Sequence, residues 1–159
     1  LPRALAVVAT DLASGEAVTF RQGNPGTAVR ASAAVPGIFQ PTRINGRDYV
    51  DGGLVSPVPV RIARELGADF VIAVDISARP KDGKTGSSVE VLLQTFAIMG
   101  QTLGRHETAT ADVVIRPTTA DLTQTDFSSR HRAVLEGERA AALVLPDLKR
   151  KLDVRRGKE

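Results

Sequence analysis

One acidic residue followed by two glycines, Asp51-Gly52-Gly53, is the part of the sequence best suited to proton-transfer chemistry. Asp51 ends the second strand of a predicted hairpin, and loops at sheet edges often carry functional groups. The two glycines tolerate positive φ and allow the backbone to lie close to a neighbouring group. An ordinary aspartate has a pKa of about 3.9 and is a weak base, so burial is needed to strengthen it. Asp51 is therefore a candidate general base, with a simple Asp-Gly turn as the alternative.

A nucleophile to match this base is not found in these 159 residues. A serine nucleophile on a sharp strand-to-helix turn needs glycine two residues before it and two residues after it. Ser88 comes closest, with Gly86 before it, but Glu90 takes the second position. A glycine-rich loop that could form an oxyanion hole is also missing. Both features are therefore absent from this sequence.

The histidines and the other acidic residues suggest weaker alternatives. His106 and His131 fall near the ends of predicted helices, where solvated histidines are more common than metal ligands or triad members. Asp11 and Asp75 each follow a buried strand, and we interpret them as residues that orient loops. Ser32 lies in an alanine-rich helical stretch and is assigned to packing. No set of side chains has metal-ligand spacing, so no metal is expected.

Strands that alternate with helices predict βαβ units and an α/β fold, three layers thick, with a mostly parallel sheet flanked by helices. Asn45-Gly46 predicts a hairpin within it. A helix is expected to be capped by Ser56 and ended by Gly67, and Ser87 with Glu90 has capping-box spacing. The predicted strands are 5–9, 17–20, 42–44, 47–50, 70–74 and 113–115; further helices are 27–35, 89–103 and one from about 129 that Pro146 should bend or break.

Composition excludes several classes of protein. Apolar residues make up 42% and charged residues 25%, as in an ordinary globular domain. The absence of cysteine excludes disulfides and thiolate catalysis. No apolar run approaches the roughly 18 residues of a membrane span. Basic residues gather in 147–159, where we expect a solvated, partly frayed tail, with contact to anionic lipid headgroups as the alternative. No aromatic residues accompany these charges, so no nucleic acid partner is expected.

Two blocks of sequence carry a family resemblance. The first is ASAAVPGIFQP at 31–41, and the second is YVDGG at 49–53. In this order they are similar to the two C-terminal signature blocks of the patatin-like phospholipase family. The segments ATDLASG at 9–15 and VPVRIARELGAD at 58–69 resemble the bacterial branch of that family. We therefore interpret residues 1–159 as the C-terminal part of a single patatin-like domain whose N-terminal half is missing.

The resemblance implies a lipid acyl hydrolase, a serine esterase of the phospholipase A type, that uses a Ser–Asp dyad. It also implies that the nucleophilic serine and the oxyanion loop lie in an N-terminal segment missing from this chain, so we expect the chain alone to be inactive. The residue that matches the catalytic aspartate of the family is Asp51. Gly52, Gly53 and Pro36 are expected to shape and support its turn. Ile38 and Phe39 are interpreted either as the lining of an acyl-chain pocket or as ordinary core residues.

The same resemblance sets the expected partners. They are a lipid or other ester substrate, the periphery of a membrane and the missing N-terminal segment of the same protein, with no cofactor. The expected location is the cytoplasm or the membrane periphery. The alternative function is a non-catalytic patatin-like module that acts as a scaffold or pseudoenzyme.

Overall fold

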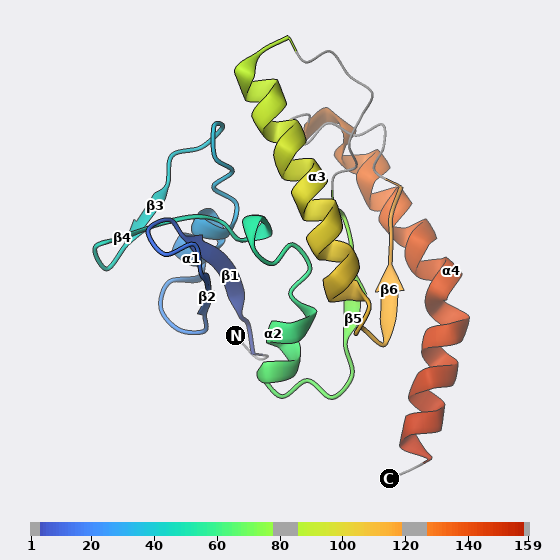
Figure 1. Cartoon of the computed structure of the whole chain (residues 1–159). Coiled ribbons are helices and arrows are strands. Elements are labelled where there is room, and N and C mark those ends of the chain that lie inside the picture. The colour runs from blue at the N-terminus through green and yellow to red at the C-terminus, as the bar shows by residue number, and fades with distance from the viewer. Residues whose placement is uncertain (1–3, 78–85, 119–126, 158–159) are drawn as a thin grey trace.

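The computed structural model describes residues 4–77, 86–118 and 127–157, which form two sheets and four α-helices (Figure 1). One sheet is four-stranded, in the order β2-β1-β4-β3, and the other is the pair β5-β6. The strands are β1 (Val7–Asp11), β2 (Ala17–Phe20), β3 (Thr42–Ile44), β4 (Arg47–Asp51), β5 (Ile72–Val74) and β6 (Val113–Ile115). The helices are α1 (Pro25–Ser32), α2 (Val60–Glu65), α3 (Ser88–Thr108) and α4 (Arg130–Arg156), with short 3-10 turns η1 (Gly52–Leu54) and η2 (Phe127–Ser129).

The mixed content of helices and strands is confirmed, but the described residues do not form the predicted three-layer, mostly parallel sheet. All three strand pairs of the larger sheet are antiparallel. Short links join β1 to β2 and β3 to β4, and a short link can only connect antiparallel neighbours, because a parallel pair needs a crossover of about a dozen residues or more. β5 and β6, which α3 connects, do pair in parallel, with Ile72 opposite Val113.

The predicted hairpin at Asn45-Gly46 is confirmed. Asn45 has φ 49° and Gly46 has φ 81°, and these positive values at both central residues fit the tight turn that matches the twist of a hairpin. The hairpin brings Ile44 opposite Arg47. It thereby fixes the register of β4, the strand that ends at Asp51.

Two separate clusters of buried side chains hold the chain together. In the four-stranded sheet, Ala9, Ala31 and Tyr49 pack together, and the ring of Phe20 meets that of Tyr49 edge-on at 5.1 Å between centroids. The second cluster joins α2 to β5 and consists of Val58, Val60, Val71 and Ala73. The segment that follows Asp51 connects the two clusters.

The helix boundaries differ from the predictions in three places. α1 ends at Ser32, three residues earlier than expected, and a turn leads from it to β3. Ser56 does not cap α2, because its hydroxyl is hydrogen-bonded to the carboxylate of Glu107 on α3. α4 continues without interruption past Pro146 to Arg156, so most of the predicted tail is helical. The capping box of Ser87 and Glu90 at the start of α3 is confirmed.

Large apolar side chains on β5 and α3 are exposed in the described part of the chain. Ile72 is 45% exposed and Val74 52%, although β5 was expected to be a central, buried strand. On α3, Val89 and Met99 belong to the predicted apolar face and are also exposed. Parallel strands are normally covered on both faces. α4 packs against β6 (Figure 1), and these side chains of β5 and α3 remain exposed in the described part of the chain.

Candidate active site

Asp51 is held by its backbone at the end of β4. Its N–H donates to the carbonyl oxygen of Ala34 at 3.1 Å, and its carbonyl oxygen accepts a hydrogen bond from the Thr10 hydroxyl at 2.7 Å. Ala34 belongs to the segment after α1, and Thr10 lies on the neighbouring strand β1. The position of Asp51 is therefore set by contacts with two segments distant in sequence.

The carboxylate of Asp51 points back to the turn that follows it. Its Oδ1 accepts a hydrogen bond from the N–H of Gly53 at 2.7 Å, which caps η1. Burial raises the pKa of Asp51 above its ordinary value, and the hydrogen bond from Gly53 partly opposes this shift. A carboxylate with a raised pKa is a stronger base than an exposed one.

Gly52 and Gly53 are required for close approach, not for positive φ. A Cβ on Gly52 would lie 2.3 Å from the carbonyl oxygen of Val8, a distance that no side chain tolerates. A Cβ on Gly53 would lie 3.0 Å from Oδ1 of Asp51. Neither residue is among the glycines with positive φ. Gly52 thus lets the turn after Asp51 pack directly on β1, and Gly53 leaves room for the Asp51 carboxylate.

A pocket of about 340 Å³ contains Asp51 in its wall. It lies between the start of β1, the turn after β4 and the segment that follows β5. Three serines also line it, although Ser32 was assigned to packing alone from the sequence. The lining residues are Ala6, Val7, Val8, Ser32, Asp51, Gly52, Gly53, Ser56, Pro57, Pro59, Ile76 and Ser77.

Within the described ranges, no serine hydroxyl is hydrogen-bonded to the Asp51 carboxylate. Ser56 is engaged with Glu107, whose second carboxylate oxygen accepts the N–H of Val58 at 2.8 Å. The hydroxyl of Ser77 is buried and has no partner among the described atoms. The pocket therefore presents a carboxylate and apolar walls, and the described chain holds no assembled Ser–Asp pair.

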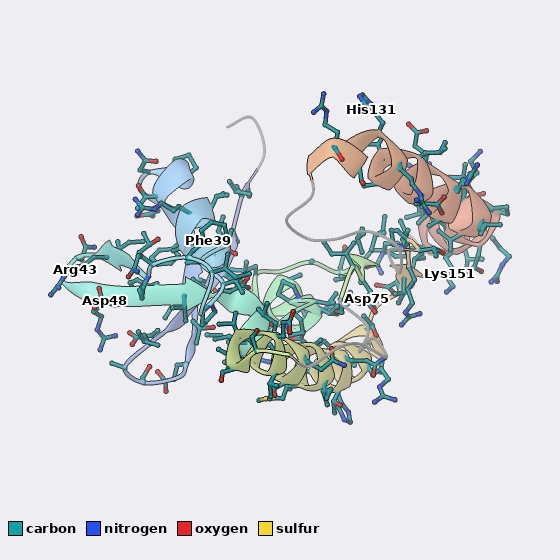
Figure 2. All side chains as sticks on the ribbon, turned by 90° about the horizontal axis from the view of Figure 1, so that it is seen from above. Phe39, Arg43, Asp48, Asp75, His131 and Lys151 are labelled. Carbon is teal, nitrogen blue, oxygen red and sulfur yellow. The ribbon has the colours of Figure 1, made fainter. Side chains whose placement is uncertain are left out.

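The other residues singled out near Asp51 lie in the turn between α1 and β3. Pro36 is half-buried, and the N–H groups of Ile38 and Phe39 both donate to the carbonyl oxygen of Val35. Ile38 is 37% exposed and Phe39 59%, and neither lines the Asp51 pocket. Phe39 lies on the side of the molecule that holds the four-stranded sheet (Figure 2).

The remaining candidates are placed away from Asp51. His106 is exposed in the last turn of α3, and His131 is exposed at the start of α4, on the opposite side of the molecule from Phe39 (Figure 2). Asp11 binds the N–H groups of Ala13 and Ser14, and Asp75 binds the N–H of Ser77. Both aspartates thus orient their own loops. A search of the described residues found no cluster of side chains able to hold a metal ion.

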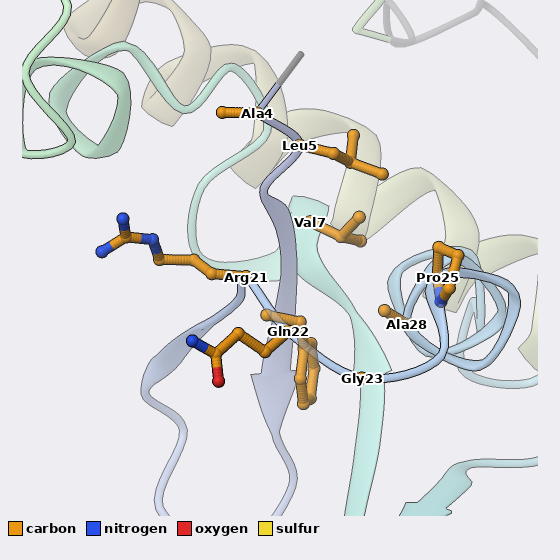
Figure 3. Close-up of a pocket in the computed structure, with 9 residues that line it drawn as sticks. Ala4, Leu5, Val7, Arg21, Gln22, Gly23, Pro25 and Ala28 are labelled. Carbon is orange, nitrogen blue, oxygen red and sulfur yellow. The ribbon is translucent and has the colours of Figure 1, made fainter. Parts of the chain in front are cut away.

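A second pocket, of about 330 Å³, opens between the start of β1, the end of β2 and the start of α1 (Figure 3). Its polar side chains are those of Arg21 and Gln22, and it contains no carboxylate or hydroxyl. It therefore lacks the groups that acyl transfer requires. None of the described helices is long and apolar enough to cross a membrane.

Sequence reasoning missed two residues that organise this site. Thr10, which binds Asp51, and Glu107, which binds Ser56 and Val58, were not singled out, because their roles depend on contacts between segments distant in sequence. Ala34 lies in the block 31–41 that was expected to support Asp51. The block containing Thr10 had been noticed, but nothing in its residue types indicated a bond to Asp51.

Known proteins are similar to the part of the chain that contains Asp51. The model of the patatin-like phospholipase family matches residues 2–64, which include Thr10 and Asp51. An uncharacterized NTE family protein of Mycobacterium tuberculosis is 40% identical over 77 residues, covering 48% of this chain and 21% of that protein. Another from the same organism is 27% identical over 178 residues, covering 94% of this chain and 30% of that protein.

A third relative carries a biochemical name. The lysophospholipase NTE1 of the yeast Meyerozyma guilliermondii is 36% identical over 50 residues, covering 31% of this chain and 4% of that protein. The chain thus spans less than a third of the length of each of these relatives. The resemblance inferred from the sequence is confirmed for residues 2–64, which match the model of the patatin-like phospholipase family.

Proposed function

We propose that this chain is part of a lipid acyl hydrolase in which Asp51 is the general base of a Ser–Asp dyad. The observation that carries the proposal is the half-buried Asp51 carboxylate, which has a raised pKa and lies in the wall of a largely apolar pocket. The match to patatin-like phospholipases includes this residue. The name of the yeast relative, a lysophospholipase, supports a lipid ester as the substrate class.

In the proposed reaction, a serine hydroxyl attacks the ester carbonyl while Asp51 accepts its proton. Collapse of the tetrahedral intermediate transfers the acyl group to the serine, and the proton held by Asp51 passes to the departing alcohol. Asp51 then takes a proton from the water that attacks the acyl-enzyme, and it returns this proton to the serine oxygen as the fatty acid is released. We also propose peripheral contact with the membrane that supplies the lipid, through basic residues near the end of α4 such as Lys149 and Arg156.

The serine is proposed to come from polypeptide outside these 159 residues. No serine of the chain has the flanking glycines of a nucleophile turn. The exposed apolar residues of β5 and α3 favour a covering segment, and among the described strands β5 pairs with β6 alone. We propose that the N-terminal segment of the same protein adds strands there and completes a three-layer fold.

A non-catalytic patatin-like module is the second candidate. It is favoured by the bonding of Asp51, whose carboxylate contacts the N–H of Gly53 and no serine in the described chain. In this case the turn after β4 is a structural device and the pocket carries no reaction. The upstream sequence distinguishes the two candidates, because a module of this kind needs no Gly-x-Ser-x-Gly turn.

The test is an activity measurement on the longer protein that contains these residues. Asp51→Asn keeps an acceptor for the N–H of Gly53 and removes the base, so hydrolysis of p-nitrophenyl esters should fall by roughly a hundredfold or more. Asp48→Asn is the matched control, since Asp48 is an exposed aspartate on the same strand. Circular dichroism should show both variants folded.

Each outcome bears on one of the two candidates. Loss of activity in Asp51→Asn, with activity kept in Asp48→Asn, supports the dyad. Full turnover in Asp51→Asn would show that Asp51 is not the base. A longer protein that folds but hydrolyses no ester of any chain length would favour the non-catalytic module.

A further inference from the structure

The hydroxyl of Thr10 has one partner, and that partner is Asp51. Thr10 lies on β1 and is 4% exposed, and its Oγ1 donates to the carbonyl oxygen of Asp51 at 2.7 Å. In the ladder between β1 and β4, Thr10 is opposite Val50, and Asp51 is opposite Ala9. The hydroxyl therefore reaches diagonally to the last residue of β4, where the ladder ends.

Asp51 occupies the point where the chain leaves the sheet. Its backbone has φ −48° and ψ 127°, and the next residue begins η1. The N–H of Asp51 is bonded to Ala34, and its carbonyl oxygen is bonded to Thr10. Because both polar groups of the Asp51 backbone are fixed in this way, the side chain is aimed at the N–H of Gly53.

Thr42 shows that a buried threonine in this sheet does not need a hydroxyl partner. It lies on β3, is 3% exposed, and its Oγ1 has no partner among the described atoms. A buried hydroxyl costs free energy unless it is bonded, so valine would serve at position 42 as well as threonine. At position 10 the hydroxyl makes a specific contact that valine cannot make.

We propose that Thr10 is a positioning residue that holds the Asp51 carboxylate in its working orientation through the Asp51 carbonyl oxygen. Thr10 does not touch the reacting groups, and it acts by fixing the peptide from which the Asp51 side chain projects. Loss of the hydroxyl frees that peptide to rotate, and rotation draws Oδ1 away from the N–H of Gly53. The catalytic meaning of this contact rests on the proposed function of Asp51, whereas the contact itself does not.

The amide proton of Gly53 reports on this orientation directly, because it donates to Oδ1 of Asp51. In the chain as it stands, its NMR resonance should shift as pH is raised through the pKa of Asp51. Thr10→Val should lose most of this shift, and Thr10→Ser, which restores the hydroxyl, should recover it. Thr42→Val, the matched loss of a buried hydroxyl in the same sheet, should leave it unchanged.

A test without any substitution covers the case in which Thr10→Val does not fold. A buried, bonded hydroxyl exchanges slowly with water, so the Thr10 hydroxyl proton should give a resolved NMR signal. That signal should show a through-space contact with the amide proton of Gly52. The proposal is overturned if that signal is absent, or if Thr10→Val folds and keeps the full Gly53 shift.

Activity of the longer protein separates this proposal from the proposed function. Thr10→Val should lower kcat by roughly tenfold to a hundredfold with little change in KM, since a small misplacement of a catalytic group has effects of this size. Thr10→Ser should recover most of the loss. If Asp51→Asn is fully active, the proposed function fails, yet the Gly53 measurement still decides whether Thr10 positions Asp51. If Asp51→Asn is inactive and Thr10→Val is fully active, the positioning role fails alone.

Discussion

Asp51 and Asp11 belong to the same sheet, yet their surroundings move their pKa values in opposite directions. Burial raises the pKa of Asp51. The N–H groups of Ala13 and Ser14 lower the pKa of Asp11, with a further contribution from Arg47, whose guanidinium lies 2.8 Å from its carboxylate. The environment of Asp51 therefore makes its carboxylate a stronger base and destabilises its ionised form, whereas the ionised carboxylate of Asp11 stabilises its loop.

Asp51→Asn should stabilise the isolated chain at neutral pH. A raised pKa means that the folded state holds the Asp51 proton more tightly than the unfolded state, so stability falls as pH rises from the unfolded value of about 3.8 through the folded pKa. Asparagine avoids this cost and keeps an acceptor for Gly53. In thermal melts from pH 3 to pH 7, the difference in melting temperature between the variant and the wild type should become smaller as pH is lowered.

Asp11→Asn is the control with the opposite sign. Because the pKa of Asp11 is lowered in the folded state, its contribution is present above the unfolded value and is lost as pH falls. This variant should be less stable than the wild type at pH 7, and the difference should shrink toward acid. Parallel pH profiles for the two variants would contradict the assignment of their environments.

Gly52→Ala should destabilise the chain by about 2–3 kcal/mol or more, because the added Cβ would meet the Val8 carbonyl oxygen at 2.3 Å. Gly100→Ala is the control, since a Cβ there meets nothing within 4 Å and Gly100 lies inside α3. It should stabilise the helix by about 1 kcal/mol. Urea unfolding of both variants measures these effects, and equal changes in the two would refute the close approach.

At the scale of elements, α3 holds the far side of the pocket through one side chain. Glu107, in the last turn of α3, bonds to the Ser56 hydroxyl and to the Val58 N–H. Ser56 is buried and lines the pocket together with Asp51. The sequence predicted α3 and its capping box, but it did not predict that this helix fixes the segment after η1.

Glu107→Gln should destabilise the chain by about 1–3 kcal/mol, because glutamine has one acceptor oxygen where glutamate has two, so that one of the two hydrogen bonds to the carboxylate is lost. Glu65→Gln is the control, since Glu65 forms an exposed pair with Arg61 on α2 that is worth only about 0.3–0.5 kcal/mol. Chemical unfolding compares the two. Equal stability losses would mean that Glu107 is not a structural anchor.

At the scale of the whole molecule, ion pairs and hydrogen bonds of charged side chains hold the end of α4 in place. Arg155 pairs with Asp69, and Lys151 donates to the carbonyl oxygen of Asp112. Asp112 is partly buried, which opposes ionisation, but the Val71 N–H and the Arg64 guanidinium outweigh this and lower its pKa. The contacts of Arg155 and Lys151 tie the end of α4 to the segments that precede β5 and β6.

Val74→Lys should reduce self-association of the isolated chain. Val74 is 52% exposed on β5, and β5 has a single strand neighbour among the described residues. Exposed apolar strand edges recruit other chains, and lysine on such an edge prevents this. Leu12→Lys is the control, because Leu12 is 54% exposed in a turn. Sedimentation velocity should show association in the wild type and the control but not in Val74→Lys.

The sequence by itself determined the local features of this protein. Asn45-Gly46 specified the hairpin because both residues tolerate positive φ, and Ser87 with Glu90 specified the start of α3 because their side chains satisfy free backbone groups. Asp51 was singled out because it precedes two glycines in the second of two blocks that resemble the family. Each of these signals comes from neighbours in sequence, whose interactions require no knowledge of the rest of the fold.

Apart from the β3–β4 hairpin, the tertiary structure decided which strands pair, and it decided the surroundings of Asp51. Short links make the pairs β1–β2 and β3–β4 antiparallel, whereas the antiparallel pairing of β1 with β4 joins strands that are distant in sequence. Thr10, Ala34 and Val8 reach Asp51 and Gly52 from distant segments, and no pattern of residue types encodes those contacts. The pKa of Asp51 depends on burial, and burial is a property of packing across the whole chain.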